Sequence, residues 1–420
     1  AVPAMRRTPC VNTRGNVADE YFSDGLTDEL AHGLSKLPGL RLTGRSSSVA
    51  FKGKSIQATE VGRTLNVGAI IEGTVRRAGN RIRLAAQLTS TRDGQLLWSD
   101  AFERTGADVF AVQDAFTSAI VTALTPRLAG ANAGSSNASA PLGVAARGTT
   151  DAGAYDLYLK GRFYWAQRGA APGDSSIKYL EATVRRDSAF ARGWAGLALA
   201  HVIRPNYNTA VEFEASGVGV EVAVRRALAL DSTLADAHVA WGVLLMRRLE
   251  LEQAAAELAS ARRLEPQNAI AAHWSASQFH AAGDTAQSDR QMEIALTLDP
   301  LSPTTFNSRA IMLTERRQFG RALENYGRVF AINPSFPTPS VMTLVWSGLA
   351  GLCREPAPSR QRVAWARRHG HPRRGRLTAL GRGPHALRPH HRRRPRDWVA
   401  RPCHVGLGVR QPNGCRCCVR

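Results

Sequence analysis

A recurring interval of 34 residues constrains this 420-residue chain more than any other feature of its sequence. Ser232, Pro266, Pro300 and Pro334 follow one another at this interval, and each closes a similar phrase, such as the Thr-Leu-Asp-Pro of residues 297–300. A fixed period of this length indicates stacked supersecondary units, each of which contacts only its neighbours. Stacks of this kind present long binding surfaces, so we expect a protein that holds a partner.

Each unit is predicted to contain two helices. In the unit that ends at Pro266, small and apolar residues recur at helical spacing on both sides of the polar stretch 247–250. Pro266 ends the second helix, because proline lacks the N–H and clashes with the preceding turn. Small residues also recur at the same interval, at Gly242, Ala276 and Ala310, where two helices must approach closely.

Two units depart from the regular length. The unit that closes at Ser232 ends about ten residues late, which predicts an inserted loop near residues 204–208. A more divergent unit runs from Tyr155 to Ser188, with Gly161 and Tyr164 at its small and aromatic positions. The array therefore contains about five units over residues 153–352.

These small, aromatic and proline positions resemble the tetratricopeptide repeat (TPR) family over residues 153–336. The resemblance implies an all-α superhelical solenoid with a concave groove, lined by the first helix of each unit, that binds a protein or peptide. The lysine, asparagine and arginine set with which some TPR proteins clamp a C-terminal carboxylate is not evident. For any one groove residue, the alternative is an ordinary solvated side chain. The groove positions implied in this chain are Arg192, Asp236, Arg247, His273, Ser277, His280, Asn307, Thr314 and Glu315.

The N-terminal part begins with a predicted amphipathic helix over residues 22–35. Phe22, Leu26, Leu30 and Leu34 lie on one face of it. A strand is expected at 40–42, a polar turn at 46–51 and a second helix at 59–65.

Alternation with period two follows. It predicts two strands, over residues 69–75 and 82–88, joined by a hairpin at Ala78-Gly79-Asn80. A third strand is expected over 95–102, followed by a long helix over 108–128 with a plausible N-cap at Asp108. In that helix, the predicted buried stripe consists of Val109, Val112, Phe116, Ile120 and Leu124.

Four runs in this part resemble the TolB N-terminal-type α/β domain: residues 19–30, 49–53, 71–77 and 97–98. The resemblance implies a bacterial signalling protein, because such a module precedes TPR arrays, often behind a serine/threonine kinase, a nucleotide cyclase or a winged-helix domain. One departure is the segment 5–10, which interrupts the place of the family's first strand, so that strand is expected to be damaged or shifted.

The net charge of +21 is unevenly distributed. Residues 354–420 hold eighteen arginines, no lysine and two acidic residues, so the rest of the chain is close to neutral for its size. This distribution gives the domains no electrostatic footprint for nucleic acid, and the tail composition predicts disorder. We expect either an out-of-frame translation of GC-rich DNA or a genuine tail that binds nucleic acid or anionic lipid. The tail cysteines do not form two separate Cys-x-x-Cys pairs, so no metal site is predicted.

No catalytic motif is recognisable in the sequence, and no cofactor is predicted. Asp24, Asp28 and Glu29 cluster at a predicted helix start, where complementarity to the helix dipole is favoured over acid–base catalysis. Before residue 354 only Cys10 and Cys353 occur, which excludes a disulfide framework. No apolar run reaches the roughly eighteen residues of a membrane-spanning helix.

The sequence thus predicts an α/β domain at 1–128, a flexible linker at 129–152, a TPR array at 153–352 and a basic tail at 353–420. The expected function is a non-catalytic scaffold that binds a protein or peptide, and no specific nucleic acid. The alternatives are a regulatory fragment of a kinase or nucleotide cyclase whose catalytic domain lies upstream, and nucleic-acid binding through the tail. The chain begins without Met, which leaves room for an upstream segment. The expected compartment is the cytoplasm, with a periplasmic or membrane-tethered location as the alternative if that segment exists.

Overall fold

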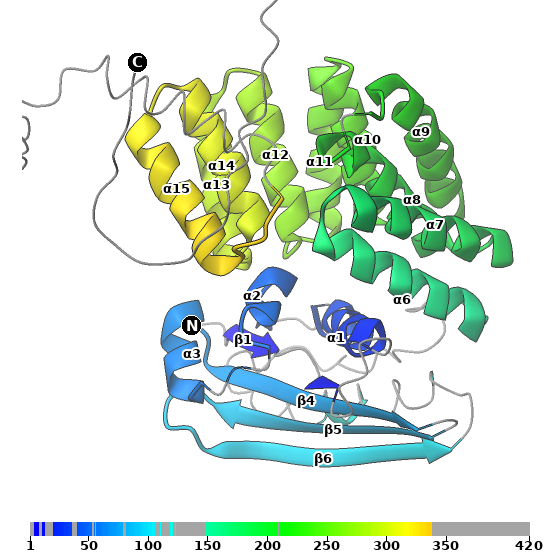
Figure 1. Cartoon of the computed structure of the whole chain (residues 1–420), viewed down its shortest axis with the longest axis vertical. Helices are drawn as coiled ribbons and strands as arrows, with labels where there is room; N and C mark the ends of the chain where they lie inside the picture. Colours follow the sequence, from blue (N-terminus) through cyan, green and yellow to red (C-terminus); the bar gives the residue numbers. More distant parts are fainter. Residues whose placement is uncertain are drawn as a thin grey trace, which may run out of the picture. The chain divides into compact units, whose positions relative to one another are not determined.

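The computed structural model describes an N-terminal α/β module and a helical solenoid, both within the compact unit Ala1–Ala357 (Figure 1). Predictions for the tail, most of the linker and most of the helix expected over 108–128 fall outside the described residues. From that expected helix, Phe110, 118–120 and Thr122 are described as helical, and Ile120 is buried. The described residues are 4–7, 11–12, 20–35, 40–52, 54, 56–78, 81–105, 110, 118–120, 122, 148–208 and 210–337.

The module is built on one mixed sheet with the strand order β3-β1-β4-β5-β6, in which β2 also pairs with β4. β1, β2 and β3 run parallel to their neighbours, whereas β4, β5 and β6 form an antiparallel meander. Ala78 pairs with Arg81, which confirms the predicted hairpin. The strands are β1 (Ala4–Arg7), β2 (Val11–Asn12), β3 (Arg41–Leu42), β4 (Ala69–Ala78), β5 (Arg81–Ser90) and β6 (Leu96–Thr105).

The first strand is present as two short pieces. Arg7 of β1 pairs with Ile71, and Val11 of β2 pairs with Thr74. Between these pairs the first strand advances by four residues and β4 by three. The interruption expected at this place therefore divides the strand and does not remove it.

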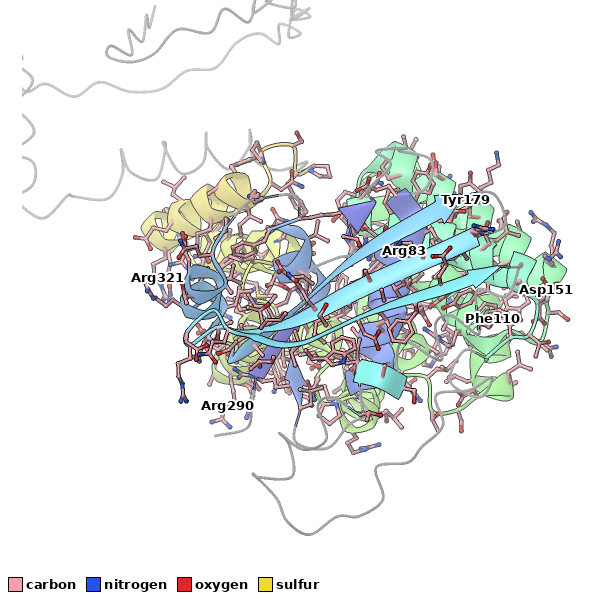
Figure 2. All side chains as sticks on the ribbon, turned by 90° about the horizontal axis from the view of Figure 1, so that it is seen from below. Arg83, Phe110, Asp151, Tyr179, Arg290 and Arg321 are labelled. Carbon is pink, nitrogen blue, oxygen red and sulfur yellow. The ribbon has the colours of Figure 1, made fainter. Side chains whose placement is uncertain are left out.

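The helices of the module are α1 (Glu20–Ser35), α2 (Arg45–Val49) and α3 (Ala58–Leu65). α1 covers one face of the sheet, whereas α3 packs against Ile70 of β4 in a separate cluster. The predicted apolar face of α1 is confirmed, because Phe22, Leu26, Leu30 and Leu34 are all buried in the main core. Burial in β5 alternates, with every second residue from Ile82 to Leu88 facing this core. Figure 2 views the opposite face of the sheet, on which Arg83 lies exposed.

The turn expected at residues 46–51 is present only at Ala50 and Phe51, because residues 46–49 belong to the short helix α2. Its serines disfavour helix when considered alone, since their hydroxyls compete for backbone hydrogen bonds. The carboxylate of Asp299, from the far end of the chain, accepts hydrogen bonds from the backbone N–H groups of Ser46 and Ser47 and so stabilises the first turn. Gly44 permits this approach, because a Cβ there would lie 2.5 Å from the Asp299 side chain.

The solenoid consists, in the described residues, of five consecutive helical hairpins with TPR-like period. A short 3₁₀ turn, η2 (Arg204–Asn206), lies at the predicted insertion and precedes the long helix α9. The hairpins are α6 (Ala152–Gln167) with α7 (Ala170–Arg186), α8 (Ala191–Ile203) with α9 (Phe213–Leu230), α10 (Ala235–Arg247) with α11 (Leu251–Leu264), α12 (Ala269–Ala281) with α13 (Thr285–Leu298), and α14 (Pro303–Glu315) with α15 (Phe319–Ile332).

Small residues set the closeness of the helices within a hairpin. A Cβ at Gly161 would lie 2.5 Å from Leu180, and one at Gly242 would lie 2.7 Å from Leu258. Asp151, Asn268 and Ser302 cap the N-termini of α6, α12 and α14 with their side chains. The 34-residue pattern therefore records both a packing requirement and a helix boundary.

Candidate functional site

We call α6, α8, α10, α12 and α14, the first helices of the five hairpins, the A helices. Their predicted groove is not fully open, because α1 and α2 lie between the sheet and this layer (Figure 1). A cavity of about 150 Å³ remains between α1 and the first four A helices. It is lined by Gly25, Asp28, Glu29, Tyr158, Leu159, Arg162, Arg192, Ala195, Leu234, Ala235, Asp236, Glu265, Asn268 and Ile270.

A buried ion pair joins α1 to the array at this cavity. The guanidinium of Arg192 donates to both carboxylate oxygens of Glu29, at 2.6 and 2.7 Å. The two side chains are only 13% and 7% exposed. Burial acts to lower the pKa of Arg192, but the charge of Glu29 outweighs it and raises that pKa well above its usual value. The pair therefore stays charged, and Arg192 is committed to the protein's own first helix.

A second ion pair crosses the A-helix layer. Arg162 of α6 donates to Asp236 of α10 at 2.9 Å, and both residues line the cavity. Asp28, also in the lining, pairs with Arg45 of α2. Both arginines of the cavity are thus matched by carboxylates. This arrangement is an internal interface between module and array, and it offers no set of groups for acid–base chemistry.

The cluster of Asp24, Asp28 and Glu29 has a different role from the predicted one. α1 begins at Glu20, so these residues lie beyond its first turn, where the influence of the helix dipole has already decayed. Asp24 instead pairs with Lys52 and Arg45. The acidic residues hold α1 against α2 and the array.

Loops of the array hold the other end of the module. The side-chain amide of Gln267 donates to the carbonyl of Leu40, at 2.7 Å, and accepts from the N–H of Leu42, at 3.1 Å. The carboxylate of Asp299 accepts hydrogen bonds from the backbone N–H groups of Ser46 and Ser47 and, at 2.6 Å, from the Ser47 hydroxyl. Burial raises the pKa of Asp299, and the hydrogen bonds from Ser47 act against that rise. The module therefore bridges several repeats.

The predicted groove residues divide into two sets. Arg192 and Asp236 are engaged at the cavity described above. Arg247 donates to the Asn206 side chain at 2.9 Å and to the Val202 carbonyl, so it secures the insertion. Burial lowers the pKa of Arg247 to about 10.

The remaining set lies on α12 and α14. His273 is only 5% exposed and faces Thr305 and Ser308 of α14. Burial, together with the charge of Arg168, lowers the pKa of His273 to about 4, so the ring is neutral. His273 is therefore a packing residue between two repeats.

The other members of this set are more accessible. His280 contacts Glu315 at 2.5 Å, and the Glu315 side chain is 58% exposed. The Ser277 and Thr314 hydroxyls bond to carbonyls of their own helices, and Asn307 is partly exposed. Within the described residues, none of these side chains hydrogen-bonds to the N-terminal module.

Sequence reasoning missed Glu29, Gln267 and Asp299 as interface residues. The sequence analysis assigned Glu29 to the acidic cluster, but the spacing of that cluster does not indicate Arg192 as its partner. Gln267 and Asp299 lie in turns between repeats, where polar residues are ordinary. Their partners come from another module, so no local pattern indicates them.

Packing at the interface yields a testable prediction. A Cβ at Gly25 of α1 would lie 2.9 Å from Leu159 of α6. Gly25→Leu is expected to lower the free energy of unfolding by about 1–3 kcal/mol, because the side chain overpacks the joint. Gly327→Leu on α15, where a Cβ meets nothing within 4 Å, is the matched control and should be neutral or stabilising. Urea unfolding measures both, and equal effects would contradict tight packing at Gly25.

The described residues contain neither a metal-binding cluster nor a membrane-spanning helix. No group of three or more histidine, cysteine, aspartate or glutamate side chains there could hold a metal ion. No described helix is both long and apolar enough to cross a membrane.

No protein-family model matches the chain. It is 36% identical over 199 residues to a Rhizobium meliloti (strain 1021) protein named "Putative adenylate cyclase 3". The match covers 47% of this chain and 32% of that protein, so the chain spans about a third of the curated relative.

Two solved structures that the chain resembles are bacterial proteins of low identity. A thermophilic TPR protein of Thermus thermophilus is 14% identical with a TM-score of 0.38, and the match covers 48% of this chain and 99% of that one. PilF of Pseudomonas aeruginosa is 18% identical with a TM-score of 0.33, over 52% and 92% of the two chains. The helical hairpins and the 34-residue period of this chain itself identify a TPR-like solenoid.

Proposed function

We propose that this chain is a non-catalytic scaffold of a bacterial signalling protein and binds a polypeptide partner along its A helices. The observation that carries the proposal is the division of the A-helix layer. Its first part is engaged by α1, whereas His280, Asn307 and Glu315 on α12 and α14 make no described hydrogen bond to the module. A helical solenoid of this kind offers an extended surface for helices or extended peptides.

The N-terminal module belongs to the same proposal. We propose that it is related to the TolB N-terminal-type domain and regulates the array to which it is joined. Its contacts reach from α6, through Tyr21 and Asp156 at 2.7 Å, to the turn before α14, through Ser47 and Asp299. A module that bridges the repeats in this way can influence the spacing of the A helices.

Retention of partners by variants of the full chain tests the scaffold. Asn307→Arg with Glu315→Arg changes the α14 surface, and Gln253→Arg with Glu252→Arg makes the same charge change on exposed positions of α11. We expect the wild-type chain and the α11 variant to retain the same specific proteins, identified by mass spectrometry, and the α14 variant to lose them. If the α14 variant retains the same proteins as the wild-type chain, the proposal is wrong.

A second candidate is the regulatory portion of a nucleotide cyclase. The similarity to the R. meliloti protein favours it, since that protein is named as a putative adenylate cyclase. Cyclic AMP formation by the product of the complete gene, with and without the α14 variant, tests it. No cyclic AMP from the wild-type product would exclude this candidate, and a changed rate in the variant would support it.

A further inference from the structure

Arg168, in the connection between α6 and α7, has an unusual backbone. Its φ of 60° and ψ of 166° fall in a region that is almost restricted to glycine. A residue with a side chain persists there only when its surroundings hold it, and such residues concentrate at functional sites. The backbone of Arg168 therefore raises the question of what its side chain binds.

The guanidinium of Arg168 stacks on the indole of Trp165, with its central carbon 3.9 Å from the ring centroid. Burial lowers the pKa of Arg168, although the side chain remains partly exposed to solvent. Among the residues that the structure describes, Arg168 has no hydrogen bond and no acidic partner. The charge of Arg168 acts to lower the pKa values of Tyr207 and His273, and the charge of Arg162 acts to lower the pKa of Arg168.

Trp165 supplies a second, independent observation. It is 7% exposed, and its indole Nε1 has no hydrogen-bond partner within the described part of the chain. A buried N–H without an acceptor is unfavourable, so the indole ring is held here by packing and by its stacking with Arg168, and not by a hydrogen bond. A cation without a counter-ion and a donor without an acceptor thus lie side by side at the end of α6.

We propose that Trp165 and Arg168 form an anionic subsite of the partner-binding surface and receive an aspartate or glutamate side chain of the partner. This inference rests on the proposed function. A guanidinium offers a planar fork that fits a carboxylate with two hydrogen bonds, and its stacking on the indole fixes its orientation.

The charges around the subsite favour a carboxylate over a phosphate group. Arg162 is already paired with Asp236, and His273 is neutral near pH 7 because its pKa is about 4. Arg168 therefore balances one negative charge. A phosphate that carries nearly two would remain uncompensated.

The test follows the indole ¹H–¹⁵N signal of Trp165 in the full chain, assigned with Trp165→Phe. The probe is an N-acetylated, C-amidated hexaglutamate peptide, and the neutral control is the corresponding hexaglutamine. We expect the signal to shift with hexaglutamate alone, and the affinity to fall at least about tenfold in Arg168→Gln. Arg226→Gln on the exposed face of α9 removes the same charge and should leave the shift unchanged.

Arg168→Lys decides the case if Arg168→Gln does not fold, and it should bind about tenfold more weakly than wild type because the fork is lost. Lack of a shift, an equal shift in Arg168→Gln, or an equal shift with inorganic phosphate would overturn the subsite. The proposed function fails separately. If partners depend on the α14 surface but Trp165 does not respond to the peptide, only the subsite is wrong. If Trp165 responds but no partner depends on α14, the scaffold proposal is wrong and the subsite stands.

Discussion

Replacing Arg192 with methionine is expected to lower the free energy of unfolding by about 3–5 kcal/mol, because it leaves the Glu29 carboxylate buried without its counter-ion. The two side chains are 13% and 7% exposed, so water can replace the lost partner only in part. Urea unfolding followed by tryptophan fluorescence measures the loss. The amides of α1 should also exchange faster with solvent, since the ion pair holds this helix against α8.

The double variant Glu29→Leu with Arg192→Met is the decisive control. Replacing both charges with apolar side chains removes the uncompensated charge, so most of the lost stability should return. Arg185→Met, which breaks an exposed pair with Glu181, should cost no more than about 1 kcal/mol. If Arg192→Met costs no more than Arg185→Met, the pair does not join the module to the array.

Stability is expected to fall by about 3 kcal/mol through His273 as the pH decreases from about 6.5 to about 4. The pKa of this buried imidazole is lowered from 6.5 to about 4, first by burial and then by Arg168. Between these values the unfolded chain binds a proton that the folded chain does not. Stability therefore rises with pH in this window and is lost on acidification.

Comparison with His273→Gln isolates this contribution, because other groups titrate in both proteins. The variant should lose less stability than the wild type between pH 7 and pH 4, as measured by urea unfolding at each pH. His238→Gln provides a control of opposite sign. The hydrogen bond to Glu257 raises the pKa of His238, so its contribution is present at low pH and is lost as the pH rises. Parallel curves for wild type and His273→Gln would contradict the assignment of a buried neutral ring.

Local sequence patterns predicted most of the helices and strands. Period and proline position located the helical hairpins, since each unit repeats the same local requirements of packing and termination. The apolar face from Phe22 to Leu34 and the alternation around Ala78 located α1 and the hairpin of β4 and β5 for the same reason. These features depend on neighbours within about twenty residues, and sequence periodicity records such neighbours directly.

Contacts between the modules could not be read in this way. The first turn of α2 is stabilised by Asp299, and Arg192 is paired with Glu29. In both cases the partner comes from a segment that is distant in the sequence. The sequence therefore predicts a groove lined by the first helix of each unit, without indicating which part of it another segment of the chain covers. In the structure, Arg192 is already bound to α1. The spacing of polar residues in a repeat indicates that a residue faces the inner layer, but it does not indicate which other segment of the chain occupies that layer.

The hydrogen bond between Ser47 and Asp299 can form only late in synthesis, because 252 residues separate the two positions. A ribosome adds about 5–20 residues per second, so α2 waits roughly 13–50 s for its capping carboxylate. During that interval, β3 also lacks the Gln267 amide that later occupies its backbone groups. During synthesis the nascent module thus exposes a strand edge that can pair with another chain.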